Sequence, residues 1–295
     1  MSTQIVGRAQ RRLAKLRRGM KASLITPVLR SRAARSNRSL VDESNDVVIC
    51  LTSYGDRLGT VHLTVESIGS GRTLPGRLIL WTDPGVDIDE LPSPLRRMQA
   101  RGLEIRPSAA RVGSHTKYFP YVMSEVAHMR PLVTADDDSI YPRYWLARLQ
   151  QAGASHAGEI VCYRAHRVGI TPEGVLKPYN SWQPARDTEA SVLNFATGVS
   201  GVYYPADFLD ELRLAGDKFL ATSPKADDVW LHYCAVANGR VIRQLGRTPE
   251  KYPELRATQE TALHRYNTGL SANDSQIADT YSPEVLSVLR SRASV

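Results

Sequence analysis

The sequence predicts an α/β fold in which a mostly parallel β-sheet is flanked by helices. From Val47 onward, short β-branched stretches alternate with amphipathic segments, which is typical of successive strands and helices. The chain has 295 residues, 42% hydrophobic and 23% charged, so it can bury a sizeable core. Its longest unbroken apolar run, residues 47–51, is far shorter than the roughly 20 residues that cross a bilayer. The composition therefore excludes global disorder and disfavours a membrane span or a signal peptide.

The expected elements follow one another in a regular order. Strands are predicted at residues 47–52, 78–81, 103–106 and 131–135, and helices at residues 58–68, 94–101 (with Ser93 as its cap), 116–129 and 143–151. In doubly wound sheets of this kind, ligands gather beyond the carboxyl ends of the strands. The residues that follow Ala135 are therefore expected to form a site.

Residues 1–40 differ from the rest of the chain in charge. They hold eleven of the 38 Lys and Arg residues and none of the 30 acidic residues. Leu13, Leu16, Met20 and Leu24 recur at three- and four-residue steps, which predicts one apolar face of a helix that Pro27 is expected to end. We expect an N-terminal arm at 1–40, one domain at 41–280 and a C-terminal tail at 281–295.

Three interpretations of this arm remain open, and two of them involve a partner. An anionic membrane surface would attract it, since each basic residue near the headgroups contributes about 1 kcal/mol. A nucleic acid would offer phosphates as well, but residues 1–40 contain no aromatic residue to stack on bases, which disfavours that interpretation. In the third interpretation the arm binds no partner and is a disordered tail that increases solubility.

The cysteines indicate a compartment. Cys50, Cys162 and Cys234 form no CxxC pair, and an odd number cannot close a complete disulfide framework. We expect a cytoplasmic protein, peripheral on the inner face of the cell membrane if the arm binds lipid.

Three adjacent carboxylates, Asp136, Asp137 and Asp138, follow the predicted strand at residues 131–135. Each close pair repels by about 1 to 4 kcal/mol, depending on the effective dielectric constant. Water and a nearby Arg can relieve this repulsion in a loop. The position directly after a buried strand instead favours a divalent cation, because Mg²⁺ or Mn²⁺ binds through one or two carboxylates plus substrate phosphates.

Several segments in order resemble the GT-A glycosyltransferases, close to the family 2 type of bacterial capsule and cell-envelope polysaccharide assembly. They are TSY at 52–54, residues 60–68, LILW at 78–81, VTADDDSIYP at 133–142, VCYRAHR at 161–167, YNSW at 179–182, TGVSGVYYP at 197–205 and ADDVWL at 226–231. The resemblance covers residues 46–280 and implies a Rossmann-like, nucleotide-diphospho-sugar transferase fold.

The resemblance also implies roles for individual residues. The acidic run is similar to the DxD motif, so Asp136 and Asp138 are expected to bind Mn²⁺ or Mg²⁺, with Asp136 and Asp137 near the nucleotide. Asp228 is expected to be the catalytic base beside Asp227, although acids also favour a helix N-terminus. The remaining donor-contacting candidates are Thr52, Ser53, Tyr54, Arg57, Asp83 and Lys117, and His264 is a further candidate metal ligand.

The function implied is metal-dependent transfer of a sugar, with inversion, from a nucleotide-sugar donor to a glycan or lipid-linked acceptor in cell-envelope or capsular polysaccharide synthesis. A metal-dependent nucleotidyltransferase would need similar carboxylates and stays an alternative. So does a non-catalytic membrane or nucleic-acid adaptor on a degenerate transferase domain. The sequence lacks GxxxxGK[ST], HExxH and GxSxG, which disfavours nucleoside triphosphate hydrolysis, zinc peptidase and serine hydrolase chemistry.

Overall fold

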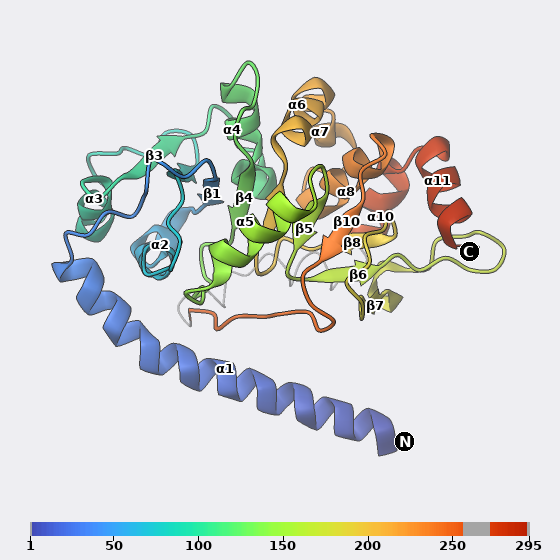
Figure 1. Ribbon diagram of the computed structural model, residues 1–295, viewed down its shortest axis with the longest axis horizontal. Helices are drawn as coiled ribbons and strands as arrows, with labels where there is room; N and C mark the ends of the chain where they lie inside the picture. The colour runs from blue at the N-terminus through green and yellow to red at the C-terminus, as the bar shows by residue number, and fades with distance from the viewer. Residues whose placement is uncertain (1, 256–271, 294–295) are drawn as a thin grey trace.

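The computed structural model of the protein describes residues 2–255 and 272–293. Helices and strands alternate through this part of the chain, as Figure 1 shows. In the first half they are α1 Ser2–Arg35, β1 Val48–Thr52, η1 Gly55–Gly59, α2 Val61–Gly69, β2 Arg77–Thr82, α3 Ser93–Gln99, β3 Leu103–Pro107, η2 Gly113–Lys117, α4 Phe119–Ser124, β4 Leu132–Ala135 and α5 Trp145–Ser155. In the second half they are β5 Ile160–Cys162, β6 Ala165–Arg167, η3 Tyr179–Ser181, β7 Gln183–Pro184, β8 Asn194–Ala196, β9 Val202–Tyr204, α6 Ala206–Ala215, α7 Phe219–Thr222, α8 Asp227–Ala237, β10 Ile242–Gln244, α10 Ala272–Thr280 and α11 Pro283–Ala293.

A seven-stranded sheet forms the centre of the molecule, in the order β10-β5-β9-β4-β1-β2-β3. The pairs β1·β2, β1·β4, β2·β3 and β5·β10 are parallel, and β9 runs antiparallel to both β4 and β5. A smaller sheet, β7-β6-β8, is antiparallel. The predicted α/β class with a mostly parallel sheet is confirmed.

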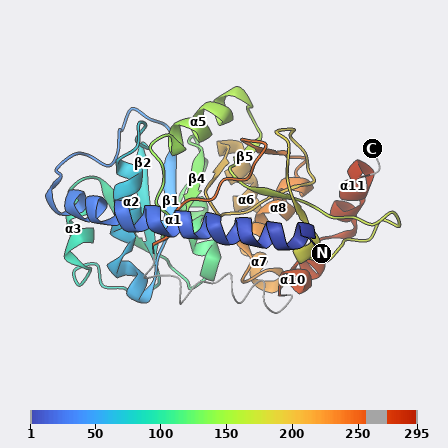
Figure 2. The same ribbon diagram turned by 90° about the horizontal axis from the view of Figure 1, so that it is seen from below.

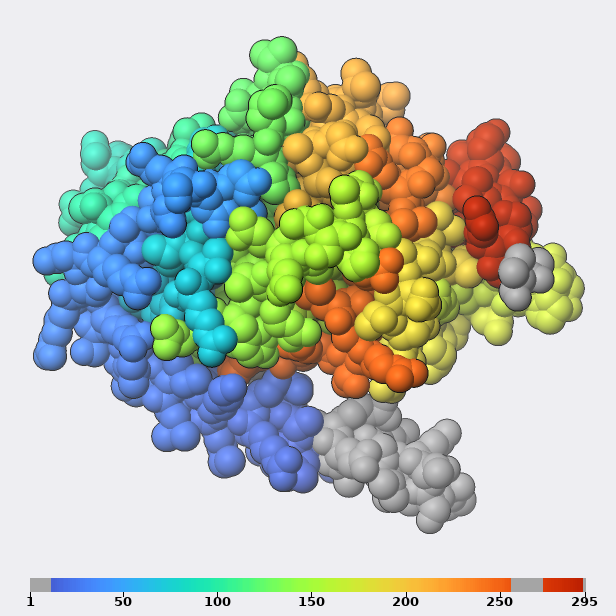
Figure 3. Space-filling model, viewed as in Figure 1, coloured from blue at the N-terminus to red at the C-terminus, as the bar shows by residue number. Residues whose placement is uncertain are grey.

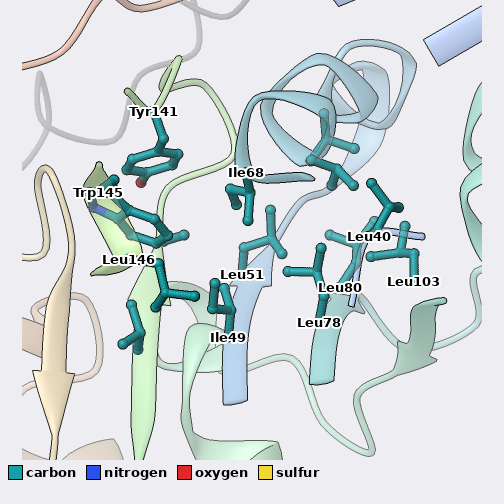
Figure 4. Close-up of a cluster of buried hydrophobic side chains, with 14 of the residues drawn as sticks. Leu40, Ile49, Leu51, Ile68, Leu78, Leu80, Leu103, Tyr141, Trp145 and Leu146 are labelled. Atoms are coloured by element: carbon teal, nitrogen blue, oxygen red, sulfur yellow. The ribbon is translucent and has the colours of Figure 1, made fainter. Parts of the chain in front are cut away.

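Both faces of the central sheet are buried, which explains the nearly continuous apolar strands. Ile49 and Leu51 of β1 face one side together with Leu80 of β2, where α2 and α5 cover them (Figure 4). The intervening residues Val48 and Cys50 face the other side and pack in a second cluster with residues of α4, α6 and α8. This alternation follows from the two-residue period of a strand.

The strand register decides where the acidic run lies. Leu51 of β1 pairs with Ala135 of β4, so both strands end at the same edge of the sheet. Ser53 and Asp137 therefore lie side by side, although more than 80 residues of chain separate them. This register brings the loops after β1 and β4 together beyond the carboxyl ends of the strands, where the site is predicted.

Helix α1 differs from expectation because Pro27 does not end it. The helix continues to Arg35, although an interior proline costs about 3 kcal/mol through its missing N–H and its clash with the preceding turn. Ala22 lies before Pro27 and Leu29 and Ala33 after it, and all three are buried. This burial on both sides of Pro27 offsets the cost of the proline and keeps the helix continuous.

Two short helices also differ from their predicted bounds. The helix expected at 116–129 is only α4, Phe119–Ser124, with Pro120 in its first turn, where a missing N–H costs least. It ends because Glu125 is extended, and Met129 beyond it is exposed. Helix α3 begins at Ser93 itself, and Pro92, not Ser93, is the residue before its first turn.

The segment expected as a C-terminal tail contains packed structure. Val285 and Leu289 of α11 are buried against α8, and Tyr281 is buried with its hydroxyl 2.5 Å from Nδ1 of His232. Residues 281–293 are therefore part of the folded body.

Candidate active site

The acidic run lies against two cations of the protein. Asp137 is buried and accepts hydrogen bonds from the Ser53 hydroxyl at 2.7 Å and from Nε of Arg57 at 2.8 Å. The second guanidinium nitrogen of Arg57 contacts the other oxygen of Asp137 and lies 3.2 Å from Asp138. The middle carboxylate thus points inward and fixes the loop, whereas Asp136 and Asp138 stay partly exposed at 22% each.

Lys117 connects the acidic run to the second acidic pair. Its Nζ donates a hydrogen bond to Oδ1 of Asp136 at 2.8 Å and lies 3.9 Å from Oδ2 of Asp227. Burial opposes the charge on Lys117, but the carboxylates of Asp136 and Asp227 outweigh it and raise the pKa of Lys117 well above its usual value. One ammonium group therefore joins residues from η2, from the loop after β4 and from the first turn of α8.

Asp228 follows Asp227 in that first turn. Its Oδ1 accepts a hydrogen bond from the backbone N–H of Gly198 at 2.8 Å. Burial and the neighbouring Asp227 carboxylate raise the pKa of Asp228 to about 7, against the opposite effect of Lys117. A carboxylate with a pKa near 7 is suited to accept a proton at neutral pH. The helix N-terminus that acids favour is present, since Asp227 and Asp228 both lie in the first turn of α8.

The partly exposed carboxylates fit a divalent cation. Burial raises the pKa of Asp138 to about 7, and the adjacent charges of Asp136 and Asp137 act in the same direction. A cation beside Asp138 would therefore relieve an electrostatic cost. Mn²⁺ or Mg²⁺ prefers such oxygen donors and needs only one or two from the protein when phosphates complete its shell.

The candidate cation site has two partly exposed carboxylates, those of Asp136 and Asp138. Within residues 2–255 and 272–293, no group of three or more His, Cys, Asp or Glu side chains is arranged to hold a metal. His264, the other candidate ligand, lies outside the described residues. The fit to a cation thus rests on Asp136 and Asp138.

The other candidates for donor contact are placed as follows. Tyr54 lies beneath the guanidinium of Arg57, 5.7 Å from the ring centre, at the rim of the acidic cluster. Thr52 ends β1, and its hydroxyl donates to the carbonyl of Trp81. Asp83 follows β2 and pairs with Arg111 at 3.4 Å, so the structure does not join it to the acidic cluster.

Two further contacts shape the site. The hydroxyl of Tyr141 accepts a hydrogen bond from the backbone N–H of Asp136 at 2.8 Å and thereby helps to orient the acidic run. A Cβ at Gly198 would lie 3.2 Å from Nζ of Lys117 and 3.3 Å from Oδ1 of Asp228, so a larger residue there would require these side chains to shift. Its place in the glycine-containing segment TGVSG is the one signal that marks it.

Comparison with known proteins identifies solved structures with a similar fold. No protein-family model matches the chain, and no curated protein matches it. The structure is similar to that of the mannosyltransferase PcManGT from Pyrobaculum calidifontis in complex with GDP-Man and Mn²⁺, with a TM-score of 0.52 and 16% identity over 95% of this chain and 79% of that chain. A structure of TarS residues 1–349 from S. aureus has a TM-score of 0.49 and 11% identity over 84% of this chain and 72% of that chain. The first of these similarities shows that the protein shares its fold with a glycosyltransferase of known structure.

Proposed function

We propose that this protein is a metal-dependent glycosyltransferase that transfers a sugar from a nucleotide-sugar donor to a glycan or lipid-linked acceptor. The observation that carries the proposal is the Lys117 ammonium, which lies between Asp136 of the acidic run and Asp227 of the second acidic pair. The acidic run at residues 136–138 and the acidic pair of Asp227 and Asp228 thus belong to one cluster. Similarity of fold to a mannosyltransferase with GDP-Man and Mn²⁺ supports the same chemistry.

In this proposal the acidic run at residues 136–138 binds the nucleotide-sugar donor. Asp136 and Asp138 would hold Mn²⁺ or Mg²⁺, and the cation would supply positive charge to the diphosphate of the donor. Arg57 and Lys117 lie beside these carboxylates, and their positive charge also attracts phosphate oxygens. Asp137 keeps the loop in place through Ser53 and Arg57.

Asp228 is the catalytic base on the acceptor side. It takes the proton from an acceptor hydroxyl as that oxygen attacks the anomeric carbon, and the bond from that carbon to the diphosphate breaks. A single displacement of this kind inverts the anomeric configuration. The N–H of Gly198 and the ammonium of Lys117 hold Asp228 and its neighbour in position.

The cysteines and the motif resemblance support a cellular setting for this activity. Cys50, Cys162 and Cys234 are buried and unpaired, which suits a reducing, cytoplasmic compartment. We infer a role in cell-envelope or capsular polysaccharide synthesis from the resemblance of the motifs. Among the described helices, none is long and apolar enough to cross a bilayer.

The test is incubation of the protein with a set of nucleotide sugars, with and without Mn²⁺, followed by analysis of the released nucleotide. Release of a nucleoside diphosphate or monophosphate that depends on Asp228 supports glycosyl transfer. Release of pyrophosphate would indicate a nucleotidyltransferase instead. Failure to bind or turn over any activated sugar would leave the non-catalytic adaptor and contradict the proposal.

A further inference from the structure

Helix α1 has an apolar face that stays exposed among the residues that the structure describes. Leu13, Leu16, Met20, Leu24 and Val28, here called the outer stripe, are 50 to 76% exposed. They recur at three- and four-residue steps and so lie along one side of the helix. Figure 2 shows α1 crossing in front of the body along much of its length, and Figure 3 shows it along the lower edge.

The opposite side of α1 is the one that packs. Ala22, Leu29 and Ala33 are buried, and the first two belong to a cluster with Leu63 of α2. The helix is therefore held by one face, so that the outer stripe is turned away from the protein. An exposed row of large apolar side chains on a well-packed helix indicates a surface that contacts something else.

The charges beside the outer stripe identify the kind of partner. Arg12, Arg17, Lys21, Arg30 and Arg32 are all exposed. No acidic residue occurs between residues 1 and 40. An apolar stripe with basic residues on both sides is the pattern of a helix that lies in the interface of an anionic bilayer.

A basic cavity lies at the end of the same helix. It has a volume of about 270 Å³ and is lined by Arg32, Arg38, Arg101 and Arg143, with Glu66 as its single acidic residue. Glu66 is neutralised by Arg101, whose Nη1 lies 2.7 Å from it. The cavity therefore offers excess positive charge to a phosphate-bearing headgroup.

The packed face of α1 connects this surface to the candidate active site. Ala22 and Leu29 pack with Ile140, two residues after Asp138, and with Leu255. The N–H of Leu255 donates a hydrogen bond to the carbonyl of Asp138 at 2.7 Å. A surface on which α1 rests would thus lie close to the acidic run.

We propose that the outer stripe of α1 docks on an anionic lipid membrane and so holds the acidic site near that membrane. The docking itself rests on α1 and on the basic cavity at its end. The consequence, that the acceptor is the lipid-linked one of the two classes proposed, rests on the proposed function.

The experiment is flotation of the full chain with vesicles of phosphatidylglycerol and phosphatidylcholine, and with vesicles of phosphatidylcholine alone. The unmodified protein should float with the anionic vesicles and lose binding as salt is raised. The double variant Leu16→Glu with Leu24→Glu should bind the anionic vesicles at least about tenfold more weakly, because both changes place a charge in the apolar stripe. Leu214→Glu is the matched control, since Leu214 is 86% exposed on α6, away from α1, and should float like the unmodified protein.

Several results would overturn the docking proposal. These are equal flotation of the double variant and the unmodified protein, absence of binding to anionic vesicles, or sedimentation showing that the outer stripe instead joins two copies of the chain in solution. Thermal melting checks that the double variant is folded. Flotation of the Asp228→Asn protein separates the two proposals, because docking needs no catalysis and should be unchanged even if the proposed activity fails.

Discussion

The backbone N–H of Gly198 donates a hydrogen bond of 2.8 Å to Oδ1 of Asp228, and a Cβ at Gly198 would lie 3.2 Å from Nζ of Lys117. This contact ties the loop between β8 and β9 to the first turn of α8. It holds a carboxylate whose pKa burial has raised to about 7. The orientation of the proposed base therefore depends on a backbone group as well as on the neighbouring charges.

Replacing Asp228 with Asn should abolish transfer while sparing donor binding. Asn keeps the shape of the side chain and can still accept from the Gly198 N–H, but it cannot take a proton. We expect kcat to fall about 100- to 10,000-fold with donor affinity unchanged, measured by product formation and by calorimetric titration of the donor. The control is Asp187→Asn, a partly exposed carboxylate paired with Arg167, which should keep full turnover. Normal turnover of the Asp228 variant would refute the assignment.

Replacing Lys117 with Met should destabilise the protein strongly. The change leaves Asp136 and Asp227 without their shared ammonium in a site where the lysine side chain is only 13% exposed. The free energy of unfolding should fall by about 3 to 5 kcal/mol, as measured by urea denaturation. Lys218→Met, at an exposed position before α7, should change it by less than about 0.5 kcal/mol.

A double variant tests whether Lys117 stabilises the protein through its charge. In the background of Asp136→Asn, loss of Lys117 should cost less than it does alone, because one carboxylate no longer needs compensation. Strict additivity of the two losses would show that Lys117 acts through packing and not through charge.

Replacing Asp138 with Asn should remove the dependence of donor binding on Mn²⁺. In the unmodified protein, chelation of the metal should weaken donor binding at least about tenfold, and Mn²⁺ should restore it, because a cation would join Asp136 and Asp138 to the diphosphate. The variant should show the weak affinity in both conditions, measured by titration calorimetry. Asp56→Asn, on the exposed side of η1, should keep the metal dependence. A metal-dependent Asp138 variant would contradict the proposed ligand.

The buried His232 should make stability depend on pH. Its Nε2 donates to the carbonyl of Val192 at 2.9 Å, and burial lowers the pKa of His232 to about 4. The folded protein therefore binds fewer protons here than the unfolded chain does between about pH 6.5 and pH 4, so this stabilisation is complete above pH 6.5 and is lost as the pH falls.

Comparison with His232→Gln isolates this contribution. The unfolding free energies of the variant and the unmodified protein should converge by about 2 kcal/mol between pH 7.5 and pH 5, as measured by urea denaturation at each pH. Val236→Ala, another buried position on α8, lacks a titrating group and should keep a constant difference. A constant difference for His232→Gln as well would contradict the pKa assignment.

Residue patterns predicted the first four strands well and the helices less well, and they gave no bounds for β5 to β10. The first four strands lie within a residue of their predicted bounds, because apolar runs ending at turn residues mark buried parallel strands clearly. The helix around Pro120 was predicted too long, since the pattern does not show that Glu125 is extended. The prediction that Pro27 ends α1 is wrong. The burial of Leu29 and Ala33 offsets the cost of the proline, and this burial depends on contacts with residues distant in sequence, which the pattern does not show.

The outer stripe shows the same distinction on a single helix. Leu13, Leu16, Met20 and Leu24 were predicted to share a face, and they do. That this face points outward, while Ala22 and Leu29 pack on the body, depends on which surface α2 and the segment around Ile140 present to the helix. Periodicity defines faces but not which of them is covered.

Three features were predictable from the order of residues: the α/β class, the position of the acidic run at the end of a buried strand, and the concentration of positive charge in the first 40 residues. All three depend on local pattern and composition. The folded chain was needed to show that Arg57 neutralises Asp137, that Lys117 joins Asp136 to Asp227, and that the Gly198 N–H meets Asp228. Such contacts join residues far apart in the chain. Their electrostatic energies fall steeply with distance and rise with burial, and both are settled only when the strands and helices pack.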